Sequence, residues 1–352
     1  MKPLRVGVLG ATGAVGQRFV QLLSANPWFE LTALAASERS TDQRYAQACT
    51  WRLSSDIPPA ARDLPVLPCE PGLPCDAVFS ALPSSVAGAV EERMAAAGYA
   101  VFSNASAHRM DADVPLLIPE VNGAHIGLIA GQRARRGWIK GMLATDPNCS
   151  TVGLALALAP LHAAFGVTQV MVTTMQALSG AGYPGVPALD SLDNVIPYIG
   201  GEEEKVATEP LKLLGSLDEA HGRIVPAEMV ISAACNRVAT RDGHLEAVSV
   251  KLASPATLED LTAAWEGFRS EPAALGCPSA VQPAIIVRRE ADRPQTNLDR
   301  DAGNGMAISV GRVRPCPVLD WKFVVLVHNT IRGAAGGSIL NAEYMMAKGL
   351  LP

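Results

Sequence analysis

The chain has 352 residues, of which 49% are hydrophobic and 18% charged, so it can bury a sizeable core and its length fits about two domains. A net charge of −5 without any lysine- or arginine-rich block argues against nucleic acid as a partner. The seven cysteines show neither a disulfide framework nor metal-binding spacing, and no apolar run is long enough to cross a membrane. The chain enters a strand directly after its first residues, which leaves no room for a signal peptide. We therefore expect a cytoplasmic protein with reduced thiols, no metal site and no membrane partner.

The first segment has the order strand, glycine turn, helix. Residues 4–9 are apolar and predict a buried parallel strand, Gly10-Ala-Thr-Gly-Ala-Val-Gly16 predicts a tight turn, and residues 17–23 predict an amphipathic helix. This order is typical of a dinucleotide-binding unit, in which bare backbone N–H groups and a helix N-terminus face a pyrophosphate. A simple tight turn without a ligand is the alternative interpretation.

The second predicted strand, residues 30–36, ends in Ser37-Glu-Arg-Ser40. An NAD-binding protein usually has an acidic residue at this strand end, whereas hydroxyl and guanidinium groups suit the 2′-phosphate of NADP. Ser37, Arg39 and Ser40 therefore favour NADP, although Glu38 lies close by and Arg39 could simply be a solvated surface charge.

Two further apolar strands follow at residues 76–82 and 99–104, separated by a helix over 86–98. Ligands of parallel α/β sheets bind at the carboxyl ends of the strands, so Ser80-Ala81 and Asn104 should face the cofactor. The alternation predicts a doubly wound parallel sheet. Arg109, which follows such a strand end, could reach an anionic substrate.

A single cysteine, Cys149, stands where the polar turn Thr145-Asp-Pro-Asn148 meets the apolar run that continues to Leu161. Ser150 and Thr151 are good helix-start residues, so the run should form a buried helix that begins close to the cysteine. A helix N-terminus favours a thiolate and offers backbone donors to an oxyanion. The alternative is a small buried hydrophobic cysteine.

The second half reads as α+β, with mostly antiparallel strands between about residues 167 and 328. A strand over 167–178 precedes the glycine-rich turn 179–185, which could hold a phosphate or let backbone approach a ligand or another subunit. Glu202 and Lys205 share one face of a charged helix start. His244 begins a strand after the tight turn Asp242-Gly243.

The end of the chain combines a strand up to about residue 328, small residues, and a helix over 339–350. The glycines and alanines between them allow close approach to a flat ring. We expect this helix to return to the first domain.

Taken together, these segments resemble the aspartate-semialdehyde dehydrogenases of the archaeal and fungal subgroup, from Gly7 through the last helix. The resemblance is carried by Gly10–Gly16, Pro147-Asn-Cys-Ser-Thr151, Gln176–Gly185, Val195–Lys205, and the pair Arg237 and His244. It implies an α/β fold with an N-terminal Rossmann-like NADP-binding domain, residues 1–148 completed by 329–352. It also implies an α+β catalytic and dimerisation domain, residues 149–328. The protein would assemble into a homodimer or a homotetramer.

The resemblance also implies the residue roles. Cys149 would be the nucleophile and His244 the acid/base, Arg237 would bind the substrate carboxylate, and Glu202, or Glu203 in its place, would face the ammonium group. Arg109 and Lys205, with Asn148 beside them, would form the phosphate site, and Gln176 would hold the acyl-enzyme. The implied cofactor contacts are Gly10, Thr12, Gly13, Ala14, Val15, Ser37, Arg39, Ser40, Ser80, Ala81, Asn104, Ser179, Gly180 and Asn329.

The implied reaction is the NADPH-dependent conversion of L-aspartyl 4-phosphate to L-aspartate 4-semialdehyde through a thioester on Cys149, in lysine, threonine and methionine biosynthesis. Malonyl-CoA reductase, N-acetylglutamyl-phosphate reductase and a non-enzymatic NADP-binding regulator are the alternatives. Arg237 together with Glu202 favours a free amino acid as substrate, and the presence of both Cys149 and His244 argues against the regulator.

Overall fold

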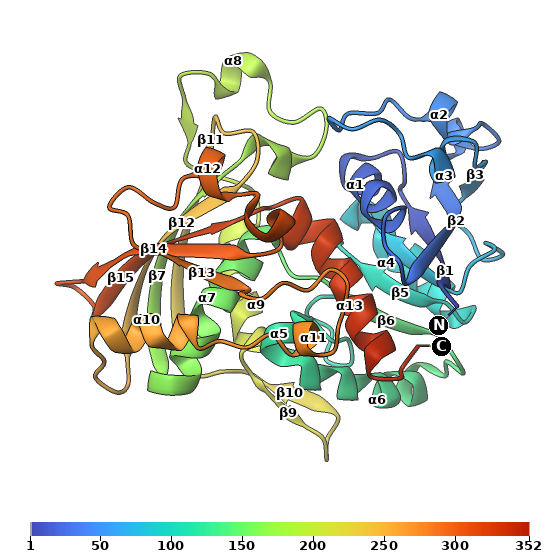
Figure 1. The fold of residues 1–352 in the computed structure, drawn as a ribbon. Coiled ribbons are helices and arrows are strands. Elements are labelled where there is room, and N and C mark those ends of the chain that lie inside the picture. Colours follow the sequence, from blue (N-terminus) through green and yellow to red (C-terminus); the bar gives the residue numbers. More distant parts are fainter. Residues whose placement is uncertain (1, 352) are drawn as a thin grey trace.

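The computed structural model describes residues 2–351 and contains two lobes, each built on one sheet (Figure 1). The first lobe has a six-stranded parallel sheet in the order β3-β2-β1-β4-β5-β6. Its strands are β1 (Leu4–Leu9), β2 (Phe29–Ala36), β3 (Val66–Pro68), β4 (Ala77–Ser80), β5 (Ala100–Ser103) and β6 (Met142–Thr145). Its helices are α1 (Ala14–Leu23), η1 (Glu38–Ser40), α2 (Tyr45–Ala48), α3 (Pro59–Arg62), α4 (Ser84–Ala96), α5 (Pro119–Asn122), η2 (Gly123–Gly127) and α6 (Leu128–Arg136).

The predicted doubly wound sheet is confirmed, with its strand order reversing between β1 and β4. At this point Gly10 adopts a φ of +76°, and a Cβ added to it would lie 2.8 Å from the Ala81 carbonyl oxygen. Only glycine fits there, because both the left-handed backbone and the close strand end exclude a side chain. The glycine turn thus determines the shape of the space at the carboxyl ends of β1 and β4.

One strand of this sheet was not predicted. Thr145, which the sequence predicts to begin the turn before Cys149, instead ends β6, which pairs with β5 in parallel. The strand is only four residues long and fully buried, so its sequence lacks the alternation that marks a half-exposed strand.

The second lobe has a seven-stranded sheet in the order β13-β14-β15-β12-β7-β11-β8. Most neighbours pair antiparallel, as predicted, whereas β7–β11 and β13–β14 pair in parallel. The strands are β7 (Val167–Gln176), β8 (Val195–Ile196), β11 (Val230–Val238), β12 (His244–Leu252), β13 (Ile285–Arg288), β14 (Ile308–Pro315) and β15 (Trp321–Val327), with β9 (Ser216–Asp218) and β10 (Arg223–Val225) in a separate hairpin.

The remaining helices are α7 (Cys149–Phe165), η3 (Leu178–Ala181), α8 (Ala188–Ser191), α9 (Glu202–Leu213), α10 (Leu258–Glu266), α11 (Glu271–Ala274), α12 (Thr296–Asp299), η4 (Ala302–Gly305), the π-helical turn η5 (Ile331–Ala335) and α13 (Gly336–Ala347). Helices α7, α9 and α10 share one hydrophobic core with the inner face of the sheet. On β12, the residues that alternate with this core lie on the other face, where Ala247 and Lys251 are exposed and Leu245 and Ser249 are half-buried.

Helix α7 begins one residue earlier than Ser150 and Thr151 suggested. Asn148 is its N-cap, and the Asn148 side chain accepts hydrogen bonds from the backbone N–H groups of Ser150 and Thr151. Cys149 therefore stands in the first turn of a helix that is buried almost throughout. The capping asparagine, rather than the two hydroxyl residues, fixes the start of the helix.

The last helix, α13, returns to the first lobe as predicted and lies along its side facing the second lobe in Figure 1. Its residues Ile339, Ala342 and Met345 belong to the core of the first sheet. Polar contacts reinforce this packing, since the Ser338 hydroxyl lies 2.6 Å from the side-chain oxygen of Asn104. No helix within residues 2–351 has both the length and the apolar character needed to cross a membrane.

The close packing of α7 on the second sheet gives a stability prediction. A Cβ added to Gly153 would lie 2.9 Å from Cγ1 of Val327, so Gly153→Ala should overpack the core and cost about 1–3 kcal/mol. Gly131, in α6, has nothing within 4 Å of its added Cβ, so Gly131→Ala should gain up to about 1 kcal/mol from helix propensity. The two urea unfolding midpoints should move in opposite directions; a gain in both would contradict the packing argument.

Candidate active site

A cleft of about 610 Å³ lies between the two lobes, where the carboxyl ends of β4 and β5 face the start of α7. Predicted site residues that line it are Val15, Ala81, Asn104, Arg109, Asn148, Cys149, Ser179, Gly180, Glu202, Lys205, Arg237 and Asn329. Residues not singled out from the sequence also line it, among them Leu82, Ser84, Ser106, Gly182, Ile199, Thr330, Gly333 and Ala334. For the small residues around Gly333, the sequence predicts only that they allow close approach to a flat ring.

Cys149 and His244, which lie 95 residues apart in the chain, meet beside this cleft. The Sγ atom of Cys149 is 3.2 Å from Nε2 of His244. Gly333 packs directly on the cysteine, because a Cβ added there would lie 2.9 Å from the Cys149 Cα. The absence of a side chain at Gly333 thus lets the backbone of η5 pack against the backbone and Cβ of Cys149.

His244 is fully buried and held through both ring nitrogens. Its Nδ1 atom accepts a hydrogen bond of 3.0 Å from the backbone N–H of Ala177, at the end of β7. Burial, together with the positive charge of Arg237 and the neighbouring His328, lowers the pKa of His244 to about 3. The imidazole is therefore neutral at physiological pH.

The thiol of Cys149 is also neutral in this structure. Burial and the nearby carboxylate of Glu202 raise the pKa of Cys149 to about 12, although Arg109 and Arg237 act in the opposite direction. The direction of this shift is opposite to the one expected from the helix N-terminus, because burial disfavours the charged form of the sulfur.

Glu202 opens α9 and connects three predicted substrate residues. Its carboxylate accepts hydrogen bonds from Lys205 at 2.9 Å, from the side chain of Asn148 at 2.7 Å and from Gln176 at 3.2 Å. Although burial acts to raise it, these donors lower the pKa of Glu202 below its usual value. The carboxylate is therefore ionised in the cleft.

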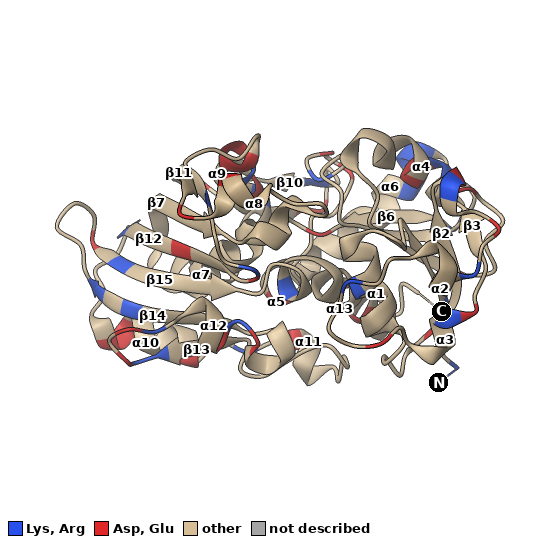
Figure 2. Cartoon of the chain, turned by 90° about the horizontal axis from the view of Figure 1, so that it is seen from above, with Lys and Arg blue, Asp and Glu red and all other residues tan. Residues whose placement is uncertain are grey.

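The neighbouring Glu203 has a different position. Its carboxylate accepts a hydrogen bond from the backbone N–H of Cys235 in β11, at 3.1 Å, and it does not line the cleft. The sequence left open whether Glu202 or Glu203 faces the substrate ammonium group. Of these two residues, Glu202 is the one that lines the cleft. Figure 2 shows the acidic residues at the start of α9 in red.

Arg109 is anchored by a carboxylate that sequence reasoning missed, that of Glu209. The guanidinium lies 2.9 Å from Glu209 Oε1, and Glu209 Oε2 accepts the backbone N–H of Asn148 at 2.7 Å. Glu209 stands two turns after Glu202 in α9, so helical spacing from Glu202 is a signal that could have found it. Arg237, on β11, donates to the Ala177 carbonyl at 2.7 Å and also faces the cleft.

The predicted cofactor residues fall into two groups. Val15, Ala81 and Asn104 line the cleft, as does Asn329, whose amide donates to the Ser179 hydroxyl at 2.8 Å. Ser37 and Arg39 are exposed at the carboxyl end of β2, outside the cleft lining but on the same sheet edge. The remaining predicted contacts outside the lining are Gly10, Thr12, Gly13, Ala14, Ser40 and Ser80, and the hydroxyl of Ser80 is fully buried.

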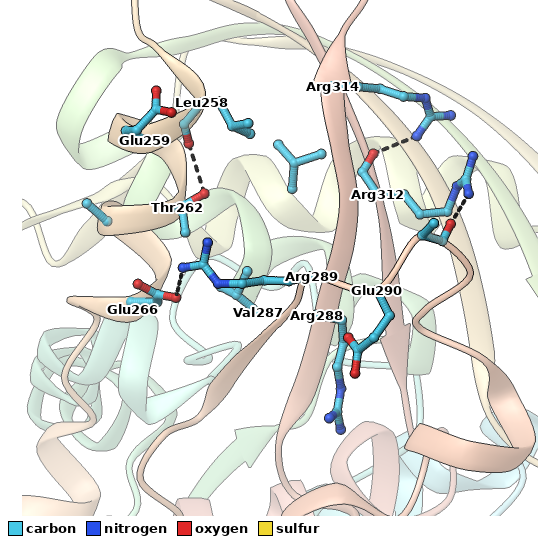
Figure 3. A pocket seen from close by; sticks show the side chains of 13 residues that line it. Leu258, Glu259, Thr262, Glu266, Val287, Arg288, Arg289, Glu290, Arg312 and Arg314 are labelled. Atoms are coloured by element: carbon cyan, nitrogen blue, oxygen red, sulfur yellow. Dashed lines mark hydrogen bonds and ion pairs between the residues drawn. The ribbon is translucent and has the colours of Figure 1, made fainter.

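A second pocket of about 530 Å³ lies on the far side of the second lobe, between α10 and the strands β13 and β14 (Figure 3). Its arginines already have partners: Arg289 pairs with Glu266 at 2.6 Å, and Arg314 donates to the Arg312 carbonyl at 2.6 Å. Its lining has no cysteine or histidine, so it offers no nucleophile. Within residues 2–351, no group of three or more histidine, cysteine or acidic residues could hold a metal ion.

Comparison with known proteins gives two family matches that follow one another along the chain. The model described as semialdehyde dehydrogenase, NAD binding domain, matches residues 5–129, and the model described as semialdehyde dehydrogenase, dimerisation domain, matches residues 158–332. Together they cover most of both lobes, and residues 130–157, which include Cys149, lie between the two matches.

Curated relatives and solved structures agree with these matches. The aspartate-semialdehyde dehydrogenase of Archaeoglobus fulgidus is 52% identical over 98% of this chain and 99% of its own length. That of Methanothermobacter thermautotrophicus is 50% identical over 97% and 98%. The crystal structure of aspartate-semialdehyde dehydrogenase with NADP from Candida albicans superposes with a TM-score of 0.92 at 44% identity, covering 99% of this chain and 100% of that one.

The anchoring of Arg109 gives a second prediction. Glu209→Ala should destabilise the protein by about 3 kcal/mol or more, because it leaves a buried guanidinium without its carboxylate. Glu266→Ala breaks the pair with Arg289, whose side chains are 50% and 71% exposed, and should cost less than about 1 kcal/mol. Urea unfolding of the two variants checks this; similar losses would show that the Arg109–Glu209 pair is no more important than a surface pair.

Proposed function

The chain belongs to the aspartate-semialdehyde dehydrogenase family, and we propose that its NADP-dependent reaction takes place in the cleft at Cys149. The observation that carries this proposal is the 3.2 Å contact between Cys149 and His244, in a cleft shared by the dinucleotide-binding lobe and the lobe with Arg237 and Glu202. The reaction converts L-aspartyl 4-phosphate to L-aspartate 4-semialdehyde, in the biosynthesis of lysine, threonine and methionine. We place the enzyme in the cytoplasm, where its seven free thiols remain reduced.

Cys149 is the nucleophile. Its sulfur bonds to the acyl carbon of the substrate while the carbon–oxygen bond to phosphate breaks, which gives a thioester. Of the first-turn N–H groups of α7, those of Ser150 and Thr151 are bonded to the Asn148 side chain, so the N–H of Cys149 itself would face the oxyanion formed in this step. Gln176, which is buried and donates a hydrogen bond to Glu202, helps to hold the acyl-enzyme.

The ionic groups of the cleft match the charges of the substrate. Arg237 binds the α-carboxylate and the ionised Glu202 faces the ammonium group, which an N-acylated substrate would lack. Arg109 and Lys205, beside Asn148, form the phosphate site. The Nε atom of Arg109 is buried without a protein partner among the described residues, which suits an anionic ligand.

The first lobe fits NADPH, which when bound supplies the hydride that reduces the thioester to the aldehyde. The bare backbone at Gly10 would face the pyrophosphate, and Ser37, Arg39 and Ser40 would hold the 2′-phosphate. We take residues 1–148 with 329–352 as the NADP-binding domain and residues 149–328 as the catalytic and dimerisation domain. Asn329 and Ser179, bonded to each other, would meet the cofactor where the two domains join.

The protein forms homo-oligomers, consistent with its dimerisation domain, and we propose that the outer face of the second sheet is the dimer interface. Central strands expose residues there, including Met171 and Thr173 on β7, Ser232 and Ala234 on β11, and Ala247 on β12. Met171 is 52% exposed although β7 has neighbours on both sides. An open face of apolar and small uncharged residues over central strands indicates a surface that a second copy covers.

The nucleophile is tested by NADPH absorbance with aspartate semialdehyde, NADP and phosphate. Phosphate-dependent formation of NADPH should fall by roughly a thousandfold or more in Cys149→Ala and persist in Cys316→Ala, whose sulfur is remote from the cleft. Oxidation of NADPH with malonyl-CoA, without turnover of aspartate semialdehyde, would instead identify the CoA-thioester reductase.

The dimer interface is tested by light scattering at micromolar concentration. The wild type should have twice the mass of one chain, and Ala247→Arg should be monomeric because it places a charge in the interface. Ile139→Arg, which changes an exposed apolar residue in the other lobe, should leave the mass unchanged. A monomeric wild type, or a dimeric Ala247→Arg variant, would contradict this interface.

A further inference from the structure

A buried lysine of the second lobe holds the backbone of residues 109–114 in the first lobe. Lys212, on α9, is 6% exposed, and its ammonium group donates hydrogen bonds to the backbone carbonyls of Arg109, Asp111 and Val114, at 2.7, 2.7 and 2.8 Å. An ammonium group has three N–H donors, so these contacts use all of them. The segment belongs to no helix or strand, so its position relative to α9 depends on such side-chain contacts.

Lys212 and Glu209 hold the same residue, Arg109. The two side chains stand three positions apart in α9 and therefore on one face of the helix. Glu209 binds the guanidinium of Arg109 at 2.9 Å, and Lys212 binds its backbone carbonyl at 2.7 Å. The guanidinium also donates to the Asn104 carbonyl at 2.7 Å. Arg109 is thus held at its backbone and at its guanidinium group, while its Nε atom has no protein partner among the described residues.

We propose that Lys212 is a positioning residue of the phosphate site, which holds the backbone of Arg109 so that the guanidinium meets the phosphate of the substrate. The proposal rests on the proposed function for the role of Arg109. It gives α9 two pairs of an acidic and a basic residue, seven positions apart. Glu202 and Lys205 line the cleft themselves. Glu209 and Lys212 hold the arginine that completes it.

The charge of Lys212 fits this role. Burial lowers the pKa of Lys212 to about 8, although the nearby carboxylates of Asp111, Asp113 and Glu209 act in the opposite direction. At neutral pH the group is therefore an ammonium ion, whereas a neutral amine would have only two N–H groups for three carbonyls. Because its donors are all used and it does not line the cleft, Lys212 acts on the phosphate through Arg109 and not by contact.

A second cation holds the same segment from within the first lobe and provides a matched control. Arg136, on α6, pairs with the side chains of Asp111 and Asp113 at 2.9 and 2.7 Å. Within residues 2–351 no hydrogen bond joins it to Arg109. Loss of Arg136 would loosen the segment without releasing Arg109 from α9. The two cations therefore separate general order in the segment from the position of Arg109.

The proposal is tested by the kinetics of Lys212→Met in the formation of NADPH from aspartate semialdehyde, NADP and phosphate. We expect kcat/KM for phosphate to fall about tenfold or more, as for the loss of one charge-assisted hydrogen bond, and kcat/KM for aspartate semialdehyde to stay within about twofold. Arg136→Met should change neither constant by more than about twofold. Lys212→Gln, which keeps two N–H donors, should lie between Lys212→Met and the wild type, and it takes the place of Lys212→Met if that variant does not fold.

A double-mutant cycle determines whether Lys212 acts through Arg109. In an Arg109→Met background, Lys212→Met should cause little further loss of kcat/KM for phosphate, because the group that it positions is already absent. Multiplicative losses in the double variant would overturn the proposal. Equal losses for phosphate and aspartate semialdehyde in Lys212→Met, or the same loss in Arg136→Met, would also overturn it. A wild type without phosphate-dependent formation of NADPH would instead refute the proposed function.

Discussion

Asn148 holds the reactive end of α7 in place, and most of the cleft depends on it. Its side-chain oxygen caps the helix, its side-chain nitrogen donates to Glu202, and its backbone N–H donates to Glu209. Asn148 thereby fixes the position of Cys149 relative to the carboxylates of Glu202 and Glu209 on α9. Since Glu209 in turn anchors Arg109, the position of a cation across the cleft follows from the same capping residue.

Burial has different effects on the pKa values of the titratable groups in the cleft, depending on how many hydrogen-bond partners each group has. The carboxylate of Glu202 stays ionised because three donors replace its water, whereas the cysteine and the histidine, with fewer partners, remain neutral. The protein thus keeps ionised the groups that match substrate charges and keeps neutral the pair at the reacting carbon.

The sequence predicted local order well and the assembly of the site poorly. The glycine turn between β1 and α1, the buried helix after Cys149, and the return of α13 were readable because turn chemistry and apolar patterning are local signals. The contact of Cys149 with His244 joins residues 95 positions apart, and only the family resemblance suggested it. Glu209 was missed because its partner Arg109 lies in the other half of the chain, and the four-residue β6 because a short buried strand has no period.

The return of α13 has a consequence for synthesis on the ribosome. The first lobe shares its core with Ile339, Ala342 and Met345, which are translated after the whole second lobe. A nascent chain that has completed β1 to β6 therefore still exposes the apolar surface that α13 will cover. The cofactor lobe, although first in sequence, reaches its native packing only after the second lobe and α13 have been synthesised, so a truncation before residue 336 would leave it without part of its core.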